Sequence, residues 1–283
     1  MTDGVVFIDK AAGVTSRSID NQIQKRFANR KVGHLGTLDP FATGLLILAV
    51  GKATKFLPYI DDSKKSYLAS LTLGIHSSTG DPEGILTKSE GPVPELTDQK
   101  IANVLKTFLG KSQQIPPMTS AIKQDGTALY TLAHEGETVE RTPRTIEVYD
   151  ISLLHHEGDH FDFVCTVSKG TYIRVLGEDI AKALGSVGYL TALRRLSIGP
   201  WQLRHAHKLE ALDEHCLIDP TVMVTGMKHQ ELDDEQAKKA KNGVLLELDP
   251  SLGPKVLVVQ HTVAIAIYRQ ESGNHYVSER GLF

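Results

Sequence analysis

The residues best suited to chemistry stand in the stretch GHLGTLDPFATGLL, residues 33–46, which contains a lone carboxylate, Asp39. The Asp39-Pro40 pair and Gly44 are typical of turns, because proline fixes its own backbone and pushes the preceding residue toward extended conformations. The apolar run over 45–50 is typical of a buried strand. We therefore expect Asp39 on a tight loop at the edge of a packed core, although the local pattern alone fits an ordinary turn aspartate better than a catalytic one.

The elements that must position this loop occur in an irregular order. Alternation or apolar character predicts strands over 4–10, 66–75, 145–156, 160–176 and 193–203. Helices are predicted after a cap at Thr15 or Ser16, from Thr97 to Gly110, and over 177–184. Because strands do not alternate regularly with helices and the sequence has no G-x-G-x-x-G or Walker loop, the pattern predicts a mixed α+β fold and disfavours a doubly wound nucleotide-binding fold.

The character of the sequence changes near residue 220. A charged helix is predicted over 231–243, followed by short strands over 244–248, 255–260, 262–270 and 275–279. We therefore divide the chain into a large domain, 1–219, and a small β-rich domain, 220–283.

The net charge of −3 conceals an uneven distribution of charged residues. Residues 1–65 hold ten Lys and Arg against six Asp and Glu, a balance of +4. Residues 210–283 hold seven against twelve, a balance of −5. A basic front part and an acidic tail are compatible with a polyanion-binding face inside an acidic total, and also with ordinary solvated charge.

Composition restricts the class of protein. The chain has 283 residues, of which 41% are hydrophobic and 23% charged, as in globular domains. Its apolar runs are far shorter than the roughly 20 residues that span a bilayer, and its N-terminus lacks the pattern of an export signal. Two cysteines, Cys165 and Cys216, are too few for a disulfide framework, and His and Cys residues lack zinc spacing. We expect a cytoplasmic protein with no membrane segment and no metal.

Five stretches carry a resemblance to a known family. Residues 33–46 resemble the catalytic motif of the TruB family of tRNA pseudouridine synthases. FIDKAAGVTS resembles the family's N-terminal lysine-glycine segment, and KKSYLASLTLG resembles its tyrosine strand. The stretch over 114–151 is similar to its long central segment, and CTVSKGTYIRVLGEDIAKALG with LTALRRLSIG is similar to the final pieces of its catalytic domain. The resemblance runs from residue 4 to about 205 in the family's order.

This resemblance implies both a fold and a function. The fold would be that of pseudouridine synthases, a mixed and mainly antiparallel sheet with flanking helices and a central cleft. Residues 220–283 would be a reduced form of the family's RNA-binding PUA-type barrel, although the net negative charge of this segment is unfavourable for binding phosphate. The function would be isomerisation of uridine 55 in the T-loop of tRNA without a cofactor. The implied partner is the tRNA T-arm, bound by a monomer that needs no other protein.

The resemblance also assigns roles within the site. Asp39 would be the essential carboxylate, adding covalently to base or sugar or removing a sugar proton to give a glycal; the sequence does not decide between these. Arg174 would keep Asp39 ionised, since a guanidinium holds a carboxylate by two parallel bonds. Tyr67 would stack on the extruded uracil, the Tyr172 hydroxyl would accept the proton from C5, and Leu196 would form an apolar wall.

Other residues are expected to meet the RNA. His34 would fill the gap left by the extruded base, and Lys10 would brace the active-site loop or meet a phosphate. The remaining candidates for backbone contacts are Lys64, Lys65, Arg141, Arg144, Arg194 and Arg195. Two positions depart from the family pattern: Ala11 replaces a usual proline, and Ser78 replaces a common acidic residue in a loop that keeps Asp81.

Three alternatives remain at this point. The first is a tRNA-folding protein that binds and opens the T-arm, with catalysis secondary. The second is a guide-dependent synthase that works inside a multi-protein particle, which the short C-terminal part and the lack of a long basic tail disfavour. The third is a carboxylate-based glycoside hydrolase, which is disfavoured because no second paired carboxylate is evident.

Overall fold

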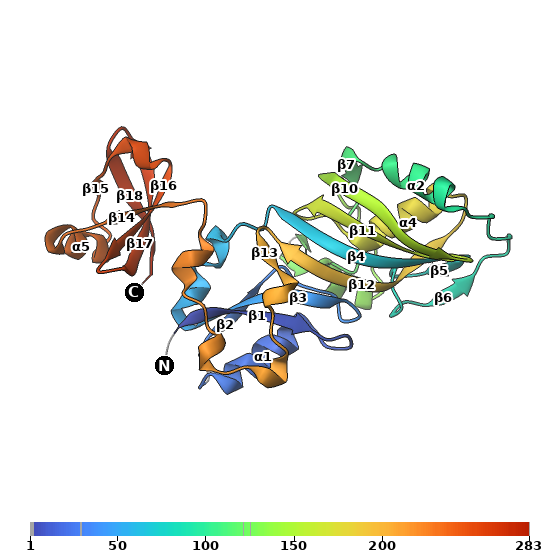
Figure 1. Cartoon of the computed structure of the whole chain (residues 1–283), viewed down its shortest axis with the longest axis horizontal. Coiled ribbons are helices and arrows are strands. Elements are labelled where there is room, and N and C mark those ends of the chain that lie inside the picture. Colours follow the sequence, from blue (N-terminus) through green and yellow to red (C-terminus); the bar gives the residue numbers. More distant parts are fainter. Residues whose placement is uncertain (1–2, 29, 121, 125, 283) are drawn as a thin grey trace.

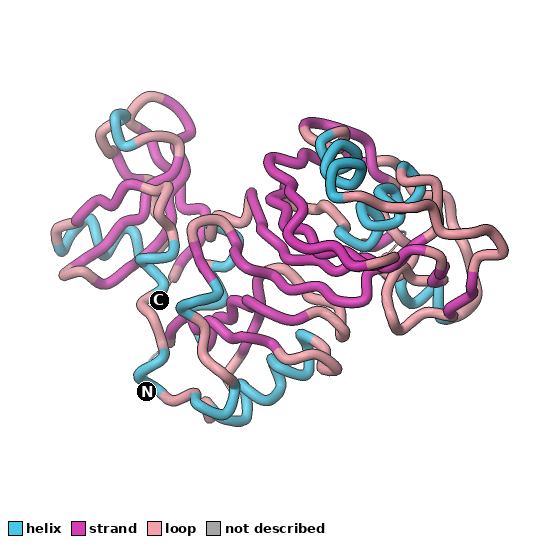
Figure 2. The backbone as a smooth tube through the Cα atoms, turned by 45° about the vertical axis from the view of Figure 1, so that its right-hand side comes forward, coloured by secondary structure: helices cyan, strands magenta, loops and turns pink. Residues whose placement is uncertain are grey.

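The computed structural model of the chain describes residues 3–28, 30–120, 122–124 and 126–282. A large sheet occupies the first part of the chain, and a smaller sheet near the C-terminus stands beside one end of it (Figures 1 and 2). Over the described residues, no helix has both the length and the apolar character needed to span a membrane.

Within the described ranges, the main sheet has nine strands in the order β1-β3-β12-β4-β11-β10-β7, with β2 paired to β3 and β13 to β12. Every pairing in it is antiparallel except that of β3 with β12, so the expected mixed, mainly antiparallel sheet is confirmed. The cleft expected across it stays a prediction. The strands are β1 (Gly4–Lys10), β2 (Val32–Leu35), β3 (Thr43–Val50), β4 (Lys64–Leu73), β7 (Gly110–Gln114), β10 (Arg144–Glu157), β11 (His160–Ser168), β12 (Gly188–Ile198) and β13 (Trp201–Gln202).

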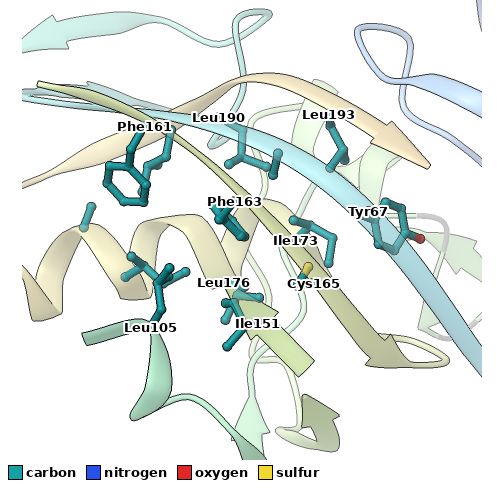
Figure 3. Packing of buried hydrophobic residues seen from close by; sticks show 14 of the residues in the cluster. Tyr67, Leu105, Ile151, Phe161, Phe163, Cys165, Ile173, Leu176, Leu190 and Leu193 are labelled. Atoms are coloured by element: carbon teal, nitrogen blue, oxygen red, sulfur yellow. The ribbon is translucent and has the colours of Figure 1, made fainter. Parts of the chain in front are cut away.

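Helices flank the main sheet and supply its core. α1 (Ser16–Arg26) begins at the Thr15 cap, whose side chain accepts from Ser18 N, and packs Ile19 and Ile23 against β1 and β3. α2 (Asp98–Lys106) and α4 (Ile173–Ala183) cover the strands β4, β11 and β10. Figure 3 shows this second cluster, in which Tyr67 and Cys165 lie among aliphatic and phenylalanine side chains. The alternation that predicted β4 and β11 therefore reflects one face covered by helices.

Smaller elements complete the fold. Its minor strand pairs are β5 (Ile75–Ser77) with β6 (Leu86–Lys88) and β8 (Lys123–Gln124) with β9 (Thr127–Ala128), next to α3 (Leu129–His134). The 3₁₀ helices are η1 (Gly51–Lys55), η2 (Leu57–Tyr59), η3 (Leu203–His205), η4 (Leu209–Ala211), η5 (Glu214–Cys216), η6 (Pro220–Met223) and η7 (Pro250–Leu252).

Several predicted boundaries are wrong. The strand predicted over 160–176 ends at Ser168, because Gly170 adopts a left-handed conformation with φ of 87° and turns the chain. α4 therefore starts at Ile173 rather than near 177, so Arg174 lies in its first turn. The helix after Thr97 ends at Lys106, and Gly110 opens β7 instead of closing the helix.

The C-terminal sheet has its own core. In the described part of the chain its strand order is β14-β16-β17-β18-β15, and α5 (Asp234–Lys241) starts with a capping box at Asp233. The strands are β14 (Lys228–Glu231), β15 (Leu246–Glu247), β16 (Lys255–Gln260), β17 (Val263–Ser272) and β18 (His275–Gly281). An apolar cluster joins this sheet to Phe56, and Tyr59 donates a hydrogen bond to Glu279 at 2.9 Å. The domain boundary at 219/220 and the PUA-type assignment stay predictions.

Candidate active site

Two neighbouring segments hold the loop that carries Asp39 through hydrogen bonds. Ser16, at the start of α1, donates from its hydroxyl to Leu38 O at 3.1 Å and accepts from Leu38 N at 2.9 Å. Gly13 N donates to Pro40 O at 2.9 Å, so the carbonyl that follows Asp39 is held from the turn after β1. The motif at 7–16 and the motif at 33–46 therefore form one packed unit.

The parallel pairing of β12 with β3 fixes the other side of the loop. Gly44, with φ of 100°, faces Arg195 where the two strands run parallel. A Cβ at Gly44 would overlap the Arg195 backbone, so the position requires glycine. The Arg195 side chain donates from Nε to Leu45 O and from Nη2 to Gly36 O, each at 2.7 Å. Arg195 therefore ties β12 to both ends of the Asp39 segment.

Arg174 faces Asp39 in the way that two-point recognition requires. Its Nε lies 2.9 Å from Asp39 Oδ2, and its Nη2 donates to Asp39 Oδ1 at 3.3 Å. The Asp39 side chain keeps 35% of its surface exposed, whereas the Arg174 side chain is 4% exposed. The guanidinium thus approaches the carboxylate from the protein interior and leaves its outer side accessible.

A second carboxylate holds the same arginine. Arg174 Nη1 lies 3.3 Å from Asp81 Oδ2 and donates to Thr79 O at 2.9 Å. Thr119 accepts from Nη1 at its hydroxyl and from Nη2 at its carbonyl, at 2.6 and 2.9 Å. The loop after β5 and the proline-bearing loop after β7 therefore fix the arginine before it meets Asp39.

The charges around Asp39 oppose one another. Burial raises the pKa of Asp39 above its ordinary value, while the Arg174 guanidinium lowers it and the Asp81 carboxylate raises it further. Burial also raises the pKa of Glu83, which stands on the same side of the site. Asp39, which is partly exposed and has a perturbed pKa, is therefore a candidate for acid, base or nucleophile chemistry.

Comparison with known proteins identifies the family. The family model described as "TruB family pseudouridylate synthase (N terminal domain)" matches residues 24–173. The tRNA pseudouridine synthase B of Chromohalobacter salexigens is 40% identical over 254 residues, which cover 87% of this chain and 82% of that protein. The protein of the same name from Francisella tularensis subsp. novicida is 38% identical over 279 residues, covering 96% and 92%. The chain belongs to the TruB family of pseudouridylate synthases.

The fold of this TruB-family enzyme agrees with a solved structure. The crystal structure of a Cbf5-Nop10-Gar1 complex contains a chain with a TM-score of 0.73 and 25% sequence identity, covering 99% of this chain and 85% of that one. The resemblance drawn from the five sequence stretches is therefore confirmed, as is the pseudouridine synthase fold.

Tyr67 lies beneath the site on β4, between Cys165 of β11 and Arg195 of β12. Only 7% of the residue is exposed, and its ring belongs to the main core cluster (Figure 3). Burial raises the pKa of the Tyr67 hydroxyl, and the charge and hydrogen bond of Arg195 oppose that rise. A stacking role requires the base to meet the small exposed part of this ring.

Tyr172 and Leu196 are half-buried at the edges of the same region. Tyr172 precedes α4, where its N–H donates to Gln114 Oε1 at 2.8 Å and its carbonyl accepts from Gln114 Nε2 at 3.1 Å. Leu196 sits where the pairing of β12 with β4 shifts register, between Arg195 and Ser197. A bulge of this kind redirects a side chain, which suits an apolar wall beside Tyr67.

Three of the predicted RNA contacts are buried: Lys10, Lys65 and Arg195. Lys10 Nζ donates to the carbonyls of Ala11, Val14 and Pro40 at 3.0, 2.7 and 3.1 Å, and burial lowers its pKa to about 8. Lys65 pairs with Asp62 at 3.2 Å. Each of these cations already has protein oxygens as partners, so a phosphate contact would have to replace one of them. The RNA contact stays a prediction for all three, and Lys10 contacts the loop through Pro40 O.

The other predicted backbone contacts are more accessible. Lys64 is exposed with its Nζ 4.2 Å from the centre of the Tyr149 ring, and Arg144 is exposed at the start of β10. Arg194 pairs with Asp9 at 2.9 Å and keeps 36% of its side chain exposed. Arg141 is half-buried and donates to Pro116 O at 3.1 Å. The contact with RNA stays a prediction for all of them.

His34 stands on β2 and is held by the protein. Its Nδ1 lies 2.9 Å from Asp20 Oδ2, its Nε2 lies 3.1 Å from Thr37 Oγ1, and its side chain is 18% exposed. Asp20 is buried on the helical face that also carries Ile19 and Ile23. Insertion of His34 into RNA stays a prediction and would exchange these contacts for base stacking.

Sequence reasoning missed the roles of Asp81, Thr119 and Asp20. A carboxylate on the buried face of α1 was a signal for Asp20, because such a group needs a partner. Asp81 was noted only as a retained loop residue, and nothing in the local pattern distinguished Thr119. Among the described residues, no group of three or more His, Cys, Asp or Glu side chains is arranged to hold a metal ion.

Proposed function

We propose that this enzyme isomerises uridine 55 in the T-loop of tRNA and that Asp39 performs the chemistry. The observation that carries the proposal is the two-point contact of Arg174 with Asp39, which leaves the outer side of the carboxylate open. The relatives named tRNA pseudouridine synthase B support tRNA as the substrate. No cofactor is needed, because the reaction leaves the atoms of the nucleotide unchanged in number.

The reaction breaks the bond between C1′ of the ribose and N1 of uracil, turns the base, and joins C1′ to C5. Asp39 adds to the sugar or base, or removes a sugar proton; either role requires its ionised form. Arg174 favours that form, and Asp81 keeps Arg174 in place when Asp39 moves or reacts. The hydrogen displaced from C5 leaves as a proton, for which Tyr172 is the proposed acceptor, and N1 takes up a proton in exchange, so the nucleotide keeps its composition.

Base extrusion precedes the chemistry and costs a few kcal/mol. Tyr67 and Leu196 are the proposed apolar contacts of the extruded uracil, and His34 is proposed to take its place in the T-loop. Lys64, Arg144 and Arg194 are proposed to hold the phosphate backbone, which makes binding sensitive to salt.

The test is tritium release from a T-arm stem-loop that carries uridine tritiated at C5. We expect the wild type to release tritium and the Asp39→Asn variant to release none while binding the stem-loop with unchanged affinity. The matched control is Asp98→Asn, which removes an 81% exposed carboxylate on α2 and should release tritium normally.

Other results would change the proposal. Tritium release by Asp39→Asn would remove the chemical role of that residue. No release by the wild type, with tight binding by both proteins, would favour the tRNA-folding alternative, since opening of the T-arm does not need Asp39. Release by the isolated chain on bare tRNA would exclude the guide-dependent alternative.

A further inference from the structure

A basic hollow of about 600 Å³ lies at the end of β2 and β3 that is remote from Asp39. Basic side chains dominate its lining, and one carboxylate accompanies them. The lining residues are Asp3, Arg30, Lys31, Gly51, Lys52, Thr54 and Lys55. We call this feature the basic hollow; neither the proposed chemistry nor the contacts assigned above use it.

The basic hollow has a defined frame. Gly51 N donates to Lys31 O at 2.7 Å, and Thr54 Oγ1 donates to Gly51 O at 2.8 Å. Gly51 has a φ of 65°, and a Cβ at this position would overlap the Asp3 carboxylate. Asp3 forms an ion pair with Arg30, so the carboxylate of the lining is already neutralised. Lys31 and Lys52 are exposed, and the lining keeps a net positive charge.

The position of the basic hollow relates it to the active site. β2 starts directly after Lys31, carries His34, and leads into the loop of Asp39. β3 pairs with β2 from Ile47 to Val50, and the other end of β3, at Gly44, lies next to the Asp39 loop. At about 3.3 Å per residue, the strand separates the two ends by about 20 Å. A polyanion lying along β2 would therefore pass from the basic hollow past His34 to Asp39.

We infer that the basic hollow binds the phosphate backbone of the RNA helix that carries the target uridine. The inference rests on the proposed function, because it takes the bound RNA to extend from Asp39 along β2. Each strand of a duplex places a phosphate about every 3.4 Å along the helix axis, so about 20 Å along the axis corresponds to about six nucleotides. Lysine is suited to such contacts, which position a nucleic acid without reading its sequence.

The neighbouring C-terminal sheet strengthens the assignment. It packs against Phe56 and Tyr59, directly after η1, but residues 220–283 carry seven basic against eight acidic side chains. A module without net positive charge supplies little attraction for phosphate. The basic hollow provides the positive charge that this part of the enzyme otherwise lacks, and it does so beside the joint between the two sheets.

The test varies the length of the RNA stem. Wild type and the double variant Lys31→Gln/Lys52→Gln are titrated with T-arm hairpins whose stems have about three or about ten base pairs, and with whole tRNA. We expect equal affinities for the short hairpin. For the long stem and tRNA, the variant should bind roughly tenfold more weakly near 0.1 M salt, and its salt slope should fall by about two.

A matched control keeps the change of charge and moves it elsewhere. Lys100→Gln/Lys106→Gln on α2 removes two exposed lysines from another part of the surface and should change neither the affinity nor its dependence on stem length. Tritium release from the short hairpin should match the wild type for both double variants, since neither pair of lysines belongs to the site.

Three results would overturn the inference. The first is unchanged binding of long stems by the Lys31/Lys52 variant, and the second is an equal loss for short and long stems. The third is competition by inorganic phosphate alone that the lysine changes abolish without any dependence on stem length, which would assign the basic hollow to a free anion. Absence of tritium release by the wild type, together with the stem-length effect, would contradict the proposed function. The basic hollow would still be an RNA site.

Discussion

The two ends of β3 carry basic side chains in opposite surroundings. At the Thr43 end, Lys10, Arg174 and Arg195 are 0%, 3% and 1% exposed, and each donates hydrogen bonds to oxygens of the Asp39 loop or its supports. At the Val50 end, Lys31 and Lys52 are exposed and face the basic hollow. The same residue types therefore serve different purposes along one strand.

The difference follows from the cost of burying a charge. A cation removed from water is tolerated where several oxygens replace its hydration, and it cannot give these up for a phosphate without paying that cost again. The buried cations therefore build the active site, whereas the exposed ones are free of such constraints and can bind RNA. Counting basic residues in the sequence cannot separate the two groups.

The largest expected effect is a loss of stability when Arg195 is replaced. The Arg195→Gln change removes the donors to the buried Leu45 O and the half-buried Gly36 O, so the free energy of unfolding should fall by about 3–5 kcal/mol. Urea unfolding measures this, and Arg144→Gln, at an exposed arginine, should stay within about 0.5 kcal/mol of wild type. Equal stabilities for both variants would contradict the contrast between buried and exposed cations.

A smaller effect, on turnover, is expected for Arg174→Lys. A single ammonium cannot hold Asp39, Asp81 and Thr119 together, so single-turnover tritium release should slow by about a hundredfold. Affinity for the T-arm, measured by filter binding, should not change because Arg174 is turned inward. Turnover at the wild-type rate would show that the two-point contact is dispensable.

Adjacent lysines on β4 sharpen the comparison further. Lys65→Gln should lower the free energy of unfolding by about 1–3 kcal/mol, because Asp62 loses its buried partner and keeps only the 66% exposed Lys169, without altering the salt dependence of RNA binding. Lys64→Gln should leave stability within about 0.5 kcal/mol and reduce the salt slope by about one. The opposite pattern in urea and salt titrations would mean that burial does not separate structural from RNA-binding lysines.

The smallest effect concerns the pH dependence of stability. Burial raises the pKa of Asp39, so keeping this group ionised opposes folding at neutral pH. Asp39→Asn should therefore be no less stable than wild type there, because Arg174 stays paired with Asp81. As pH falls through the raised pKa, Asp39 of the wild type takes up a proton. The difference in free energy of unfolding between the wild type and Asp39→Asn then narrows, and turnover is lost.

Urea unfolding from neutral to acidic pH follows the stability, and tritium release follows the activity. Asp81→Asn is a useful reference, since it removes a neighbouring carboxylate and keeps Asp39. A marked loss of stability in Asp39→Asn at neutral pH would mean that its pair with Arg174 outweighs the cost of burial.

Much of the fold was predictable because its signals are local. A cap was predicted at Thr15 or Ser16 and is confirmed at Thr15, and the half-buried strands predicted from alternation are confirmed as β4 and β11. The boundary of α4 was wrong because Gly170 turns the chain in the middle of an apolar pattern. Asp39 and Arg174 are 135 residues apart, and only the family resemblance predicted that they meet.

The sequence by itself determined the strands, the turn that carries Asp39 and the order of the family motifs, since backbone preferences and hydrophobic periodicity act over a few residues. Only the tertiary structure decided which cations are buried. Lys64 and Lys65 are neighbours in sequence, as are Arg194 and Arg195, yet in each pair one side chain is buried and the other accessible. Successive side chains of a strand point to opposite faces, and distant segments decide which face is covered.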